Sequence, residues 1–250
     1  MEEKIETEIK KGMKVEILTR AKKNIIGIVE EIGTKSNPNG MMVLLKTGEI
    51  GRVQKIIGEK PKSEAELLIK KGESYKLEFK AEALWSLNYT NQQISESKSN
   101  DLHTYKHKAS KVIIARSIAA LLNSQGGNLV IGIKENKGES FEIVGIEKDL
   151  EKLKAQSKDF STDGYKRMII DDIIRPYVPF KIYNSLNEYI SFSFEEVNGK
   201  IVCNIKIQPS RSKIFLNLEG RKIFMIRTET ETRQIVDEEL VDYCMRRFLS

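Results

Sequence analysis

The sequence is poor in the residues that build disulfide frameworks, zinc sites and membrane spans. Its 250 residues include only two cysteines and two histidines. Cys203 and Cys244 are far apart, share no C-x-x-C spacing and have no histidine nearby, which argues against a disulfide scaffold and a zinc site. No apolar run approaches the length of a bilayer span, and none follows a basic start, so no secretory signal is expected. We therefore expect a cytoplasmic protein with no membrane partner, in which both cysteines are core residues.

Charge and hydrophobic content are ordinary for a folded domain, with 31% charged and 40% hydrophobic residues. The net charge of +6 favours an anionic partner such as nucleic acid. A chain of this length has room for two domains. We expect a small domain over residues 1–60 and a larger one over residues 61–250.

Residues 1–60 predict a small β-barrel. Short strand-like runs at 15–19, 25–32, 41–46 and 49–56 are separated by turn sequences at 37–40 and 47–48. Basic residues cluster at the start of this region, and a basic rim on a small barrel suits a phosphate backbone, although a solvated face explains the same pattern. The candidate nucleic-acid-binding residues here are Lys10, Lys11, Lys14, Arg20, Lys22 and Lys23.

Three segments of this region carry a family resemblance: K-G-M-K-V-E-I, N-P-N-G-M-M-V-L-L and G-E-I-G-R-V. With them, the first 55 residues resemble the uncharacterised YwbE-type family of small barrels, which is related to KOW and SH3-like modules. The resemblance implies a fold and no defined activity.

The segment G-E-S-Y-K-L-E-F-K, residues 72–80, holds the candidate catalytic groups. Its alternation is that of a half-buried strand, which puts Glu78 and Lys80 on one face. Glu73 reaches Glu78 only if the chain bends at the start of the strand. Two carboxylates beside a lysine can hold a divalent cation that activates water at a phosphate. A polar strand face paired with its neighbours explains the same residues.

The middle of the chain alternates helical, polar and strand-like stretches. Ser63 and Glu66 form a capping box that opens a helix ending at Gly72. Residues 86–110 are polar and predict a long mobile loop, in which the four-residue spacing of His103 and His107 is a weak metal signal. Residues 111–123 predict a buried helix, and a glycine turn at 126–127 then leads into a strand over 128–133. That turn could present amides to a phosphate or serve only as a tight turn.

The last third predicts further helices and hairpins. We expect a helix over 165–175 closed by Pro176, a hairpin through Asn198 and Gly199, and a final helix capped by Asp237. Basic residues flank the late strands and either line an RNA channel or protect strand edges from aggregation. These candidate nucleic-acid-binding residues are Arg211, Lys213, Arg221, Lys222 and Arg227.

Five ordered segments give the larger domain its family resemblance: G-E-S-Y-K-L-E-F-K, I-A-A-L-L-N-S-Q-G-G-N-L-V-I-G-I-K-E, I-V-G-I, I-I-R-P-Y-V-P-F and K-I-F-M-I-R-T. With them, residues 72–248 resemble the Schlafen AlbA-type domain. The resemblance implies a catalytic set of Glu73, Glu78, Lys80 and Glu135, in which the three glutamates bind metal and Glu135 stands where the family has an aspartate. Because Schlafen cores pair two related lobes around tRNA and this chain holds one, it also implies a homodimer.

We therefore expect an α+β protein, a Schlafen AlbA-type α/β domain preceded by a small SH3/KOW-like barrel. The leading functional hypothesis is an Mg²⁺- or Mn²⁺-dependent endoribonuclease that acts on structured RNA such as tRNA. The alternatives are a non-catalytic protein that binds RNA or DNA, and a nucleotide-binding regulator that responds to ATP.

Overall fold

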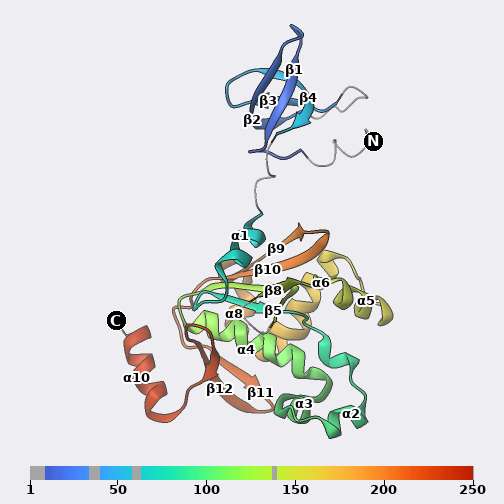
Figure 1. The fold of residues 1–250 in the computed structure, drawn as a ribbon. Helices are drawn as coiled ribbons and strands as arrows, with labels where there is room; N and C mark the ends of the chain where they lie inside the picture. Colours follow the sequence, from blue (N-terminus) through green and yellow to red (C-terminus); the bar gives the residue numbers. More distant parts are fainter. Residues whose placement is uncertain (1–8, 34–39, 58–62, 137–139, 250) are drawn as a thin grey trace. The chain divides into compact units, whose positions relative to one another are not determined.

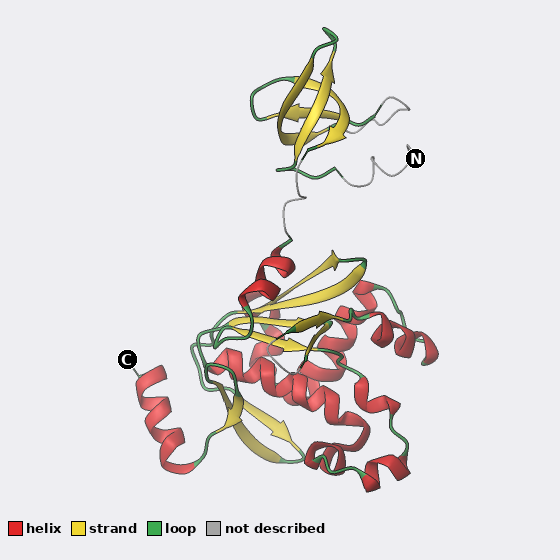
Figure 2. Ribbon diagram, viewed as in Figure 1, coloured by secondary structure: helices red, strands yellow, loops and turns green. Residues whose placement is uncertain are grey.

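The computed structural model describes residues 9–33, 40–57, 63–136 and 140–249. The chain divides into two compact units, Met1–Lys62 and Ser63–Ser250, and each is considered separately. The fold is mixed α/β, with a small all-strand unit followed by a larger unit of helices and sheets (Figure 2). In the described ranges no helix combines the length and the apolar character needed to cross a membrane.

The first unit is a closed four-stranded barrel, as the turn-separated strand pattern predicts. Every neighbouring pair of strands is antiparallel, and the first strand closes the barrel against the last. Alternating side chains such as Val15, Ile17, Val43 and Leu45 fill the interior. The Thr47–Gly48 turn joins the third and fourth strands, whereas residues 37–39 of the other predicted turn lie outside the described residues. The strands are β1 (Lys14–Thr19), β2 (Asn24–Ile32), β3 (Met42–Leu45) and β4 (Ile50–Ile56).

The second unit is organised around a four-stranded sheet in the order β5-β6-β10-β9. β5 and β6 are parallel, and β10 runs antiparallel to both β6 and β9. Gly127 begins β6 with a positive φ of 142°, and a Cβ there would lie 2.2 Å from Lys76 O. The predicted glycine turn therefore lets β6 approach β5 closely. The strands are β5 (Leu77–Lys80), β6 (Gly127–Ile131), β9 (Ile190–Val197) and β10 (Lys200–Ile207).

Helix α4 (Ala109–Asn123) is the centre of the main core, as its apolar sequence predicts. It packs against the four-stranded sheet and against a second sheet of order β11-β12-β13 (Figure 1). Because both sides are covered, almost every side chain from Val112 to Asn123 is buried. The second sheet consists of β11 (Phe215–Leu218), β12 (Arg221–Arg227) and β13 (Thr232–Gln234), and a separate hairpin pairs β7 (Ile133–Glu135) with β8 (Phe141–Ile143).

Local signals in the sequence set several boundaries. Helix α1 (Glu64–Lys71) begins with the predicted capping box, in which Ser63 Oγ accepts from Glu66 N at 3.1 Å and Glu66 Oε2 accepts from Ser63 N at 2.8 Å. Gly72 ends it with a φ of 72°. Asn198 and Gly199 both have positive φ and close the predicted β9–β10 hairpin.

The predicted loop over residues 86–110 is wrong. The segment folds into short helices because Thr90 and Ser99 cap their starts and a few apolar anchors, Ile94, Leu102 and Ala109, pack with Trp85. The composition is polar because these helices bury only one narrow side. The elements are η1 (Trp85–Asn88), α2 (Asn91–Glu96), α3 (Asn100–Tyr105) and η2 (Lys106–Lys108).

Two predicted helix ends also differ from the structure. The helical backbone that begins at Thr162 continues past Pro176 to Tyr177 and ends at the extended Val178, so Pro176 lies in the last turn and does not mark the end. Asp237 is not the cap of the last helix, which has Val236 at that position with no side-chain capping bond. The remaining helices are α5 (Glu147–Ala155), α6 (Thr162–Ile169), η3 (Ile170–Ile174), α7 (Arg175–Tyr177), α8 (Phe180–Asn184), α9 (Leu186–Tyr189) and α10 (Asp237–Phe248). Both cysteines are buried, as predicted.

Candidate functional site

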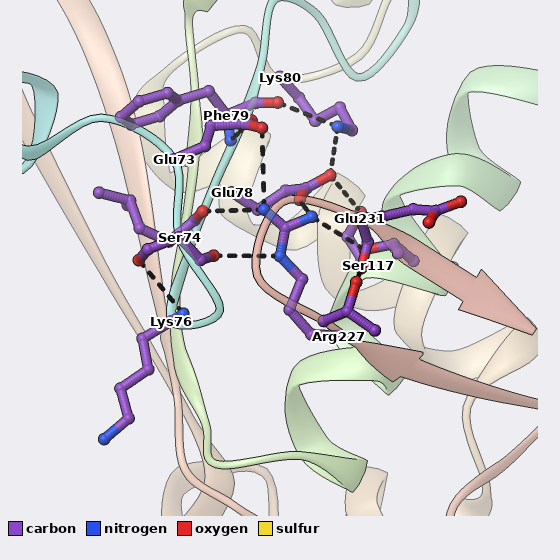
Figure 3. A network of polar contacts seen from close by, with 12 residues as sticks. Glu73, Ser74, Lys76, Glu78, Phe79, Lys80, Ser117, Arg227 and Glu231 are labelled. Atoms are coloured by element: carbon purple, nitrogen blue, oxygen red, sulfur yellow. Dashed lines mark hydrogen bonds and ion pairs between the residues drawn. The ribbon is translucent and has the colours of Figure 1, made fainter.

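A tight turn at the start of β5 brings Glu73 and Glu78 together. Ser74 N donates to Leu77 O at 3.0 Å, and Leu77 N donates to Ser74 O at 3.1 Å. The chain before the turn folds back along the strand, so that Glu73 Oε1 accepts a hydrogen bond from Phe79 N at 2.8 Å (Figure 3). The bend that would let the two carboxylates meet is therefore present.

Arg227, at the end of β12, lies between the two carboxylates (Figure 3). Its Nη1 pairs with Glu78 Oε2, and its Nη2 lies 3.7 Å from Glu73 Oε2. Two backbone carbonyls orient the guanidinium, because Nε donates to Ser74 O at 3.2 Å and Nη2 donates to Leu77 O at 3.0 Å. The side chain is only 1% exposed. Arg227 is thus a buried partner of the carboxylates.

Lys80 supplies a second cation to the same pair. Its Nζ donates to Glu78 Oε1 and, at 3.0 Å, to Phe79 O. Ser117 Oγ from α4 also donates to Glu78 Oε1 at 3.4 Å. Each oxygen of the buried Glu78 carboxylate therefore faces a cation, and two negative charges are balanced by two positive ones. We call Glu73, Glu78, Lys80 and Arg227 the carboxylate cluster.

Burial raises the pKa of Glu73 above its usual value. The hydrogen bond from Phe79 N opposes this shift, the Glu78 carboxylate adds to it, and the charges of Lys80 and Arg227 again oppose it. Glu73 therefore holds a proton more readily than an exposed glutamate does.

Glu135 is exposed and lies in β7, outside the carboxylate cluster. It lines a pocket of about 610 Å³ together with Glu73 and the end of α1. Among the residues that the structure describes, no group of three or more His, Cys, Asp or Glu side chains could hold a metal ion. His107 Nδ1 instead lies 3.4 Å from Ser86 O, and His103 contacts Ser97 O.

The predicted Mg²⁺ or Mn²⁺ centre would require the ion pairs of the carboxylate cluster to open. Mg²⁺ takes near-octahedral oxygen ligands, and a carboxylate that binds it needs an oxygen that is not already paired with a cation. Both oxygens of Glu78 are paired, and Glu73 Oε1 is bonded to the backbone. The structure thus brings together Glu73, Glu78 and Lys80 from the predicted set, adds Arg227, and leaves Glu135 beside them in the neighbouring pocket.

The other predicted basic residues lie on the surface of their units. In the barrel, Thr19 N donates to Lys23 O at 3.0 Å and closes the β1–β2 turn that carries Arg20 and Lys22. In the second unit, Arg221 and Lys222 begin β12. None of these side chains pairs with a described acidic residue. The exposed set is Lys10, Lys11, Lys14, Arg20, Lys22, Lys23, Arg211, Lys213, Arg221 and Lys222.

A small closed barrel and a mixed α/β unit with an internal carboxylate–cation cluster define a two-part protein. Residues 73–236 match the family model described as Schlafen, AlbA_2, so the chain belongs to that family. Membership of this family suggests nucleic-acid binding. Residues 2–56 match the model of an uncharacterized conserved protein family, DUF2196, over the barrel.

No curated protein matches the chain. Among solved structures, it is similar to the DIP2311 protein of Corynebacterium diphtheriae, at 16% identity and a TM-score of 0.40, covering 69% of this chain and 24% of that one. The chain thus spans about a quarter of the length of that protein. It is also similar to the N-terminal domain of a putative ATP-dependent DNA helicase RecG-related protein of Nitrosomonas europaea, at 14% identity and a TM-score of 0.32, covering 71% of this chain and 97% of that one.

Proposed function

We propose that this protein binds RNA through its phosphate backbone. The observation that carries the proposal is the charge balance of the carboxylate cluster, in which Arg227 and Lys80 already neutralise Glu73 and Glu78. A phosphate that approaches this region therefore meets no net negative charge. Family membership, which suggests nucleic-acid binding, supports the proposal independently.

The exposed basic residues supply the attraction. Six of them lie on the barrel unit and four on the second unit, and none is paired with a described carboxylate. Lysine and arginine side chains that neutralise phosphates release counterions, which makes binding strong at low salt and weak at high salt. The proposal includes a homodimer, because the Schlafen cores that this chain resembles pair two related lobes and this chain holds one.

A metal-dependent endoribonuclease is the second candidate. It is favoured by one observation, that Glu73 and Glu135 line the same pocket next to Glu78. This activity requires Lys80 or Arg227 to release Glu78 before Mg²⁺ or Mn²⁺ can bind.

A binding and cleavage experiment separates the two candidates. The full chain is titrated into labelled tRNA and into a DNA duplex of similar length at several salt concentrations, and the same samples are run on denaturing gels with Mn²⁺. We expect binding with a preference for RNA, a steep salt dependence and intact RNA. No binding to either nucleic acid at low salt would overturn the proposal.

The cleavage arm includes two variants. Glu78→Gln removes a charge from the carboxylate cluster, and Glu142→Gln removes one from an exposed position on the neighbouring β8. Mn²⁺-dependent cleavage that is lost in Glu78→Gln and kept in Glu142→Gln would establish the endoribonuclease instead. Size-exclusion chromatography with light scattering, with and without RNA, tests the homodimer.

A further inference from the structure

A second pocket, of about 600 Å³, is lined in part by Arg227 and is distinct from the pocket that Glu73 and Glu135 line. Its walls come from the turn before β5, the end of α4, the end of β12 and helix α10, and they include Tyr75, Ser124, Arg227, Arg246 and Arg247. Pockets of this size accommodate small organic ligands. We call it the Tyr75 pocket.

Arg247 gives the Tyr75 pocket a fixed positive charge. Its Nε and Nη2 donate to Ser124 O at 3.0 and 2.8 Å, and Nη2 also donates to Ser210 O at 3.2 Å. Carbonyl oxygens orient the guanidinium without cancelling its charge, and no described carboxylate forms a salt bridge with it. An arginine held in this way is suited to a phosphate, since its remaining N–H donors are preorganised.

The other charged side chains around the pocket do not cancel the positive charge of Arg247. Glu229 is the acidic side chain that lines the pocket, while Lys76, which pairs with no described carboxylate, lies beside the Tyr75 ring. Arg227 contributes little net charge here because Glu73 and Glu78 neutralise it. The Tyr75 pocket is therefore suited to one anionic group.

Tyr75 provides an aromatic surface at the edge of the same pocket. The ring is 45% exposed, although the backbone on either side of it is held by the Ser74–Leu77 turn. Lys76 Nζ lies 5.5 Å from the ring centroid, which adds a further cation beside the ring. Exposed aromatic rings on rigid turns bind the bases of single-stranded nucleic acids by stacking.

We propose that the Tyr75 pocket binds one nucleotide, with its base stacked on Tyr75 and its phosphate bound by Arg247. This inference rests on the proposed RNA binding and names the place where a single-stranded nucleotide of the RNA is held. Because Arg227 belongs both to this wall and to the carboxylate cluster, the bound nucleotide lies beside Glu73 and Glu78.

The test uses the full chain and two probes. A labelled single-stranded RNA oligonucleotide is titrated by fluorescence anisotropy, and adenosine monophosphate by calorimetry. Tyr75→Ala is expected to weaken RNA binding about tenfold, because a stacked base contributes roughly 1–3 kcal/mol. Tyr75→Trp keeps an aromatic surface and should bind as tightly as the wild type. Tyr89→Ala, which removes another exposed tyrosine of the second unit, should have no effect.

A second variant tests the phosphate contact. Arg247→Gln should weaken binding of both probes and reduce the salt dependence of RNA binding, with folding checked by circular dichroism. If Tyr75→Ala and folded Arg247→Gln both bind RNA as the wild type does, the pocket is not a nucleotide site, while the proposed RNA binding stands. If the wild type binds no RNA but binds adenosine monophosphate in a Tyr75-dependent way, the pocket takes a free mononucleotide and the RNA proposal fails. Binding of neither probe overturns both.

Discussion

The cations of the barrel and the cations of the carboxylate cluster carry the same charge in opposite environments. Lys14 and Lys23 of the barrel are exposed and have no described acidic partner, whereas Arg227 is buried between two carboxylates. Exposed charges add little to folding stability and remain available to a phosphate. Buried charges must be paired, and removing one partner leaves the other uncompensated. The two sets of cations are therefore expected to differ in whether their loss affects binding or folding.

The largest effect is expected from Arg227→Met. This change keeps much of the apolar stem but leaves Glu73 and Glu78 without their shared guanidinium, and breaking a buried pair costs about 3–5 kcal/mol. The free energy of unfolding, measured by urea denaturation, should fall by about that amount. Arg221→Met, at the exposed start of the same strand, should change it by less than about 0.5 kcal/mol. A loss below about 1 kcal/mol in Arg227→Met would contradict the pairing.

Mn²⁺ should stabilise the folded protein only when the carboxylate cluster loses one of its cations. Lys80→Met frees Glu78 Oε1 and leaves the cluster with net negative charge. Mn²⁺ should therefore stabilise Lys80→Met, by about 2.7 kcal/mol at a concentration 100 times the dissociation constant, and should leave the wild type unchanged. Thermal unfolding with Mn²⁺ and with a chelator measures this. Equal stabilisation of both proteins would show that the wild-type carboxylates are open to metal.

The barrel cations should affect binding and leave folding unchanged. Replacing Lys14 and Lys23 together by glutamine removes two charges that no described acid neutralises. The slope of log affinity against log salt for RNA should fall by about 1.4–1.8, because each phosphate contact contributes roughly 0.7–0.9. Lys46→Gln, an exposed lysine outside the predicted set, is the matched control. An unchanged slope in the double variant would remove Lys14 and Lys23 from the RNA interface.

The smallest expected effect is a pH dependence of the free energy of unfolding that comes from Glu73. Because the pKa of this carboxyl is raised in the folded protein, the folded state binds more protons than the unfolded state between the usual value of 4.5 and the raised pKa. Stability should therefore fall as the pH rises from the usual value towards the raised pKa. Glu73→Gln removes this contribution, so its stability should decline less over the same range. If the free energies of unfolding of the wild type and Glu73→Gln change in parallel across this pH range, the raised pKa of Glu73 is contradicted.

Much of the fold could be predicted from local patterns. The barrel strands follow from alternation and turn residues, α1 from its capping box, and the β9–β10 hairpin from Asn198 and Gly199. Each of these signals acts over a few neighbouring residues, where sequence distance and spatial distance are nearly the same. The segment 86–110 was mispredicted because its helices depend on a few apolar anchors that pack with one another and with Trp85, and the polar composition of the segment hides them.

The candidate site could be predicted only in part, because one of its charged groups comes from a distant strand. Glu73, Glu78 and Lys80 lie within eight consecutive residues, and the bend that joins them is local. Arg227 was identified as basic, but its burial between the two carboxylates depends on how β12 ends beside β5. The Tyr75 pocket was missed because its aromatic and basic residues come from opposite ends of the second unit, with no shared motif.

The sequence by itself determined the two-part fold, its main turns and caps, and the presence of two carboxylates beside a lysine. Only the tertiary structure decided what those carboxylates face. The buried guanidinium of Arg227, about 150 residues away in the chain, pairs with them. The physical reason is that burial makes an unpaired charge costly, so the pairing of buried charges is set by the packing of distant strands, which no local pattern encodes.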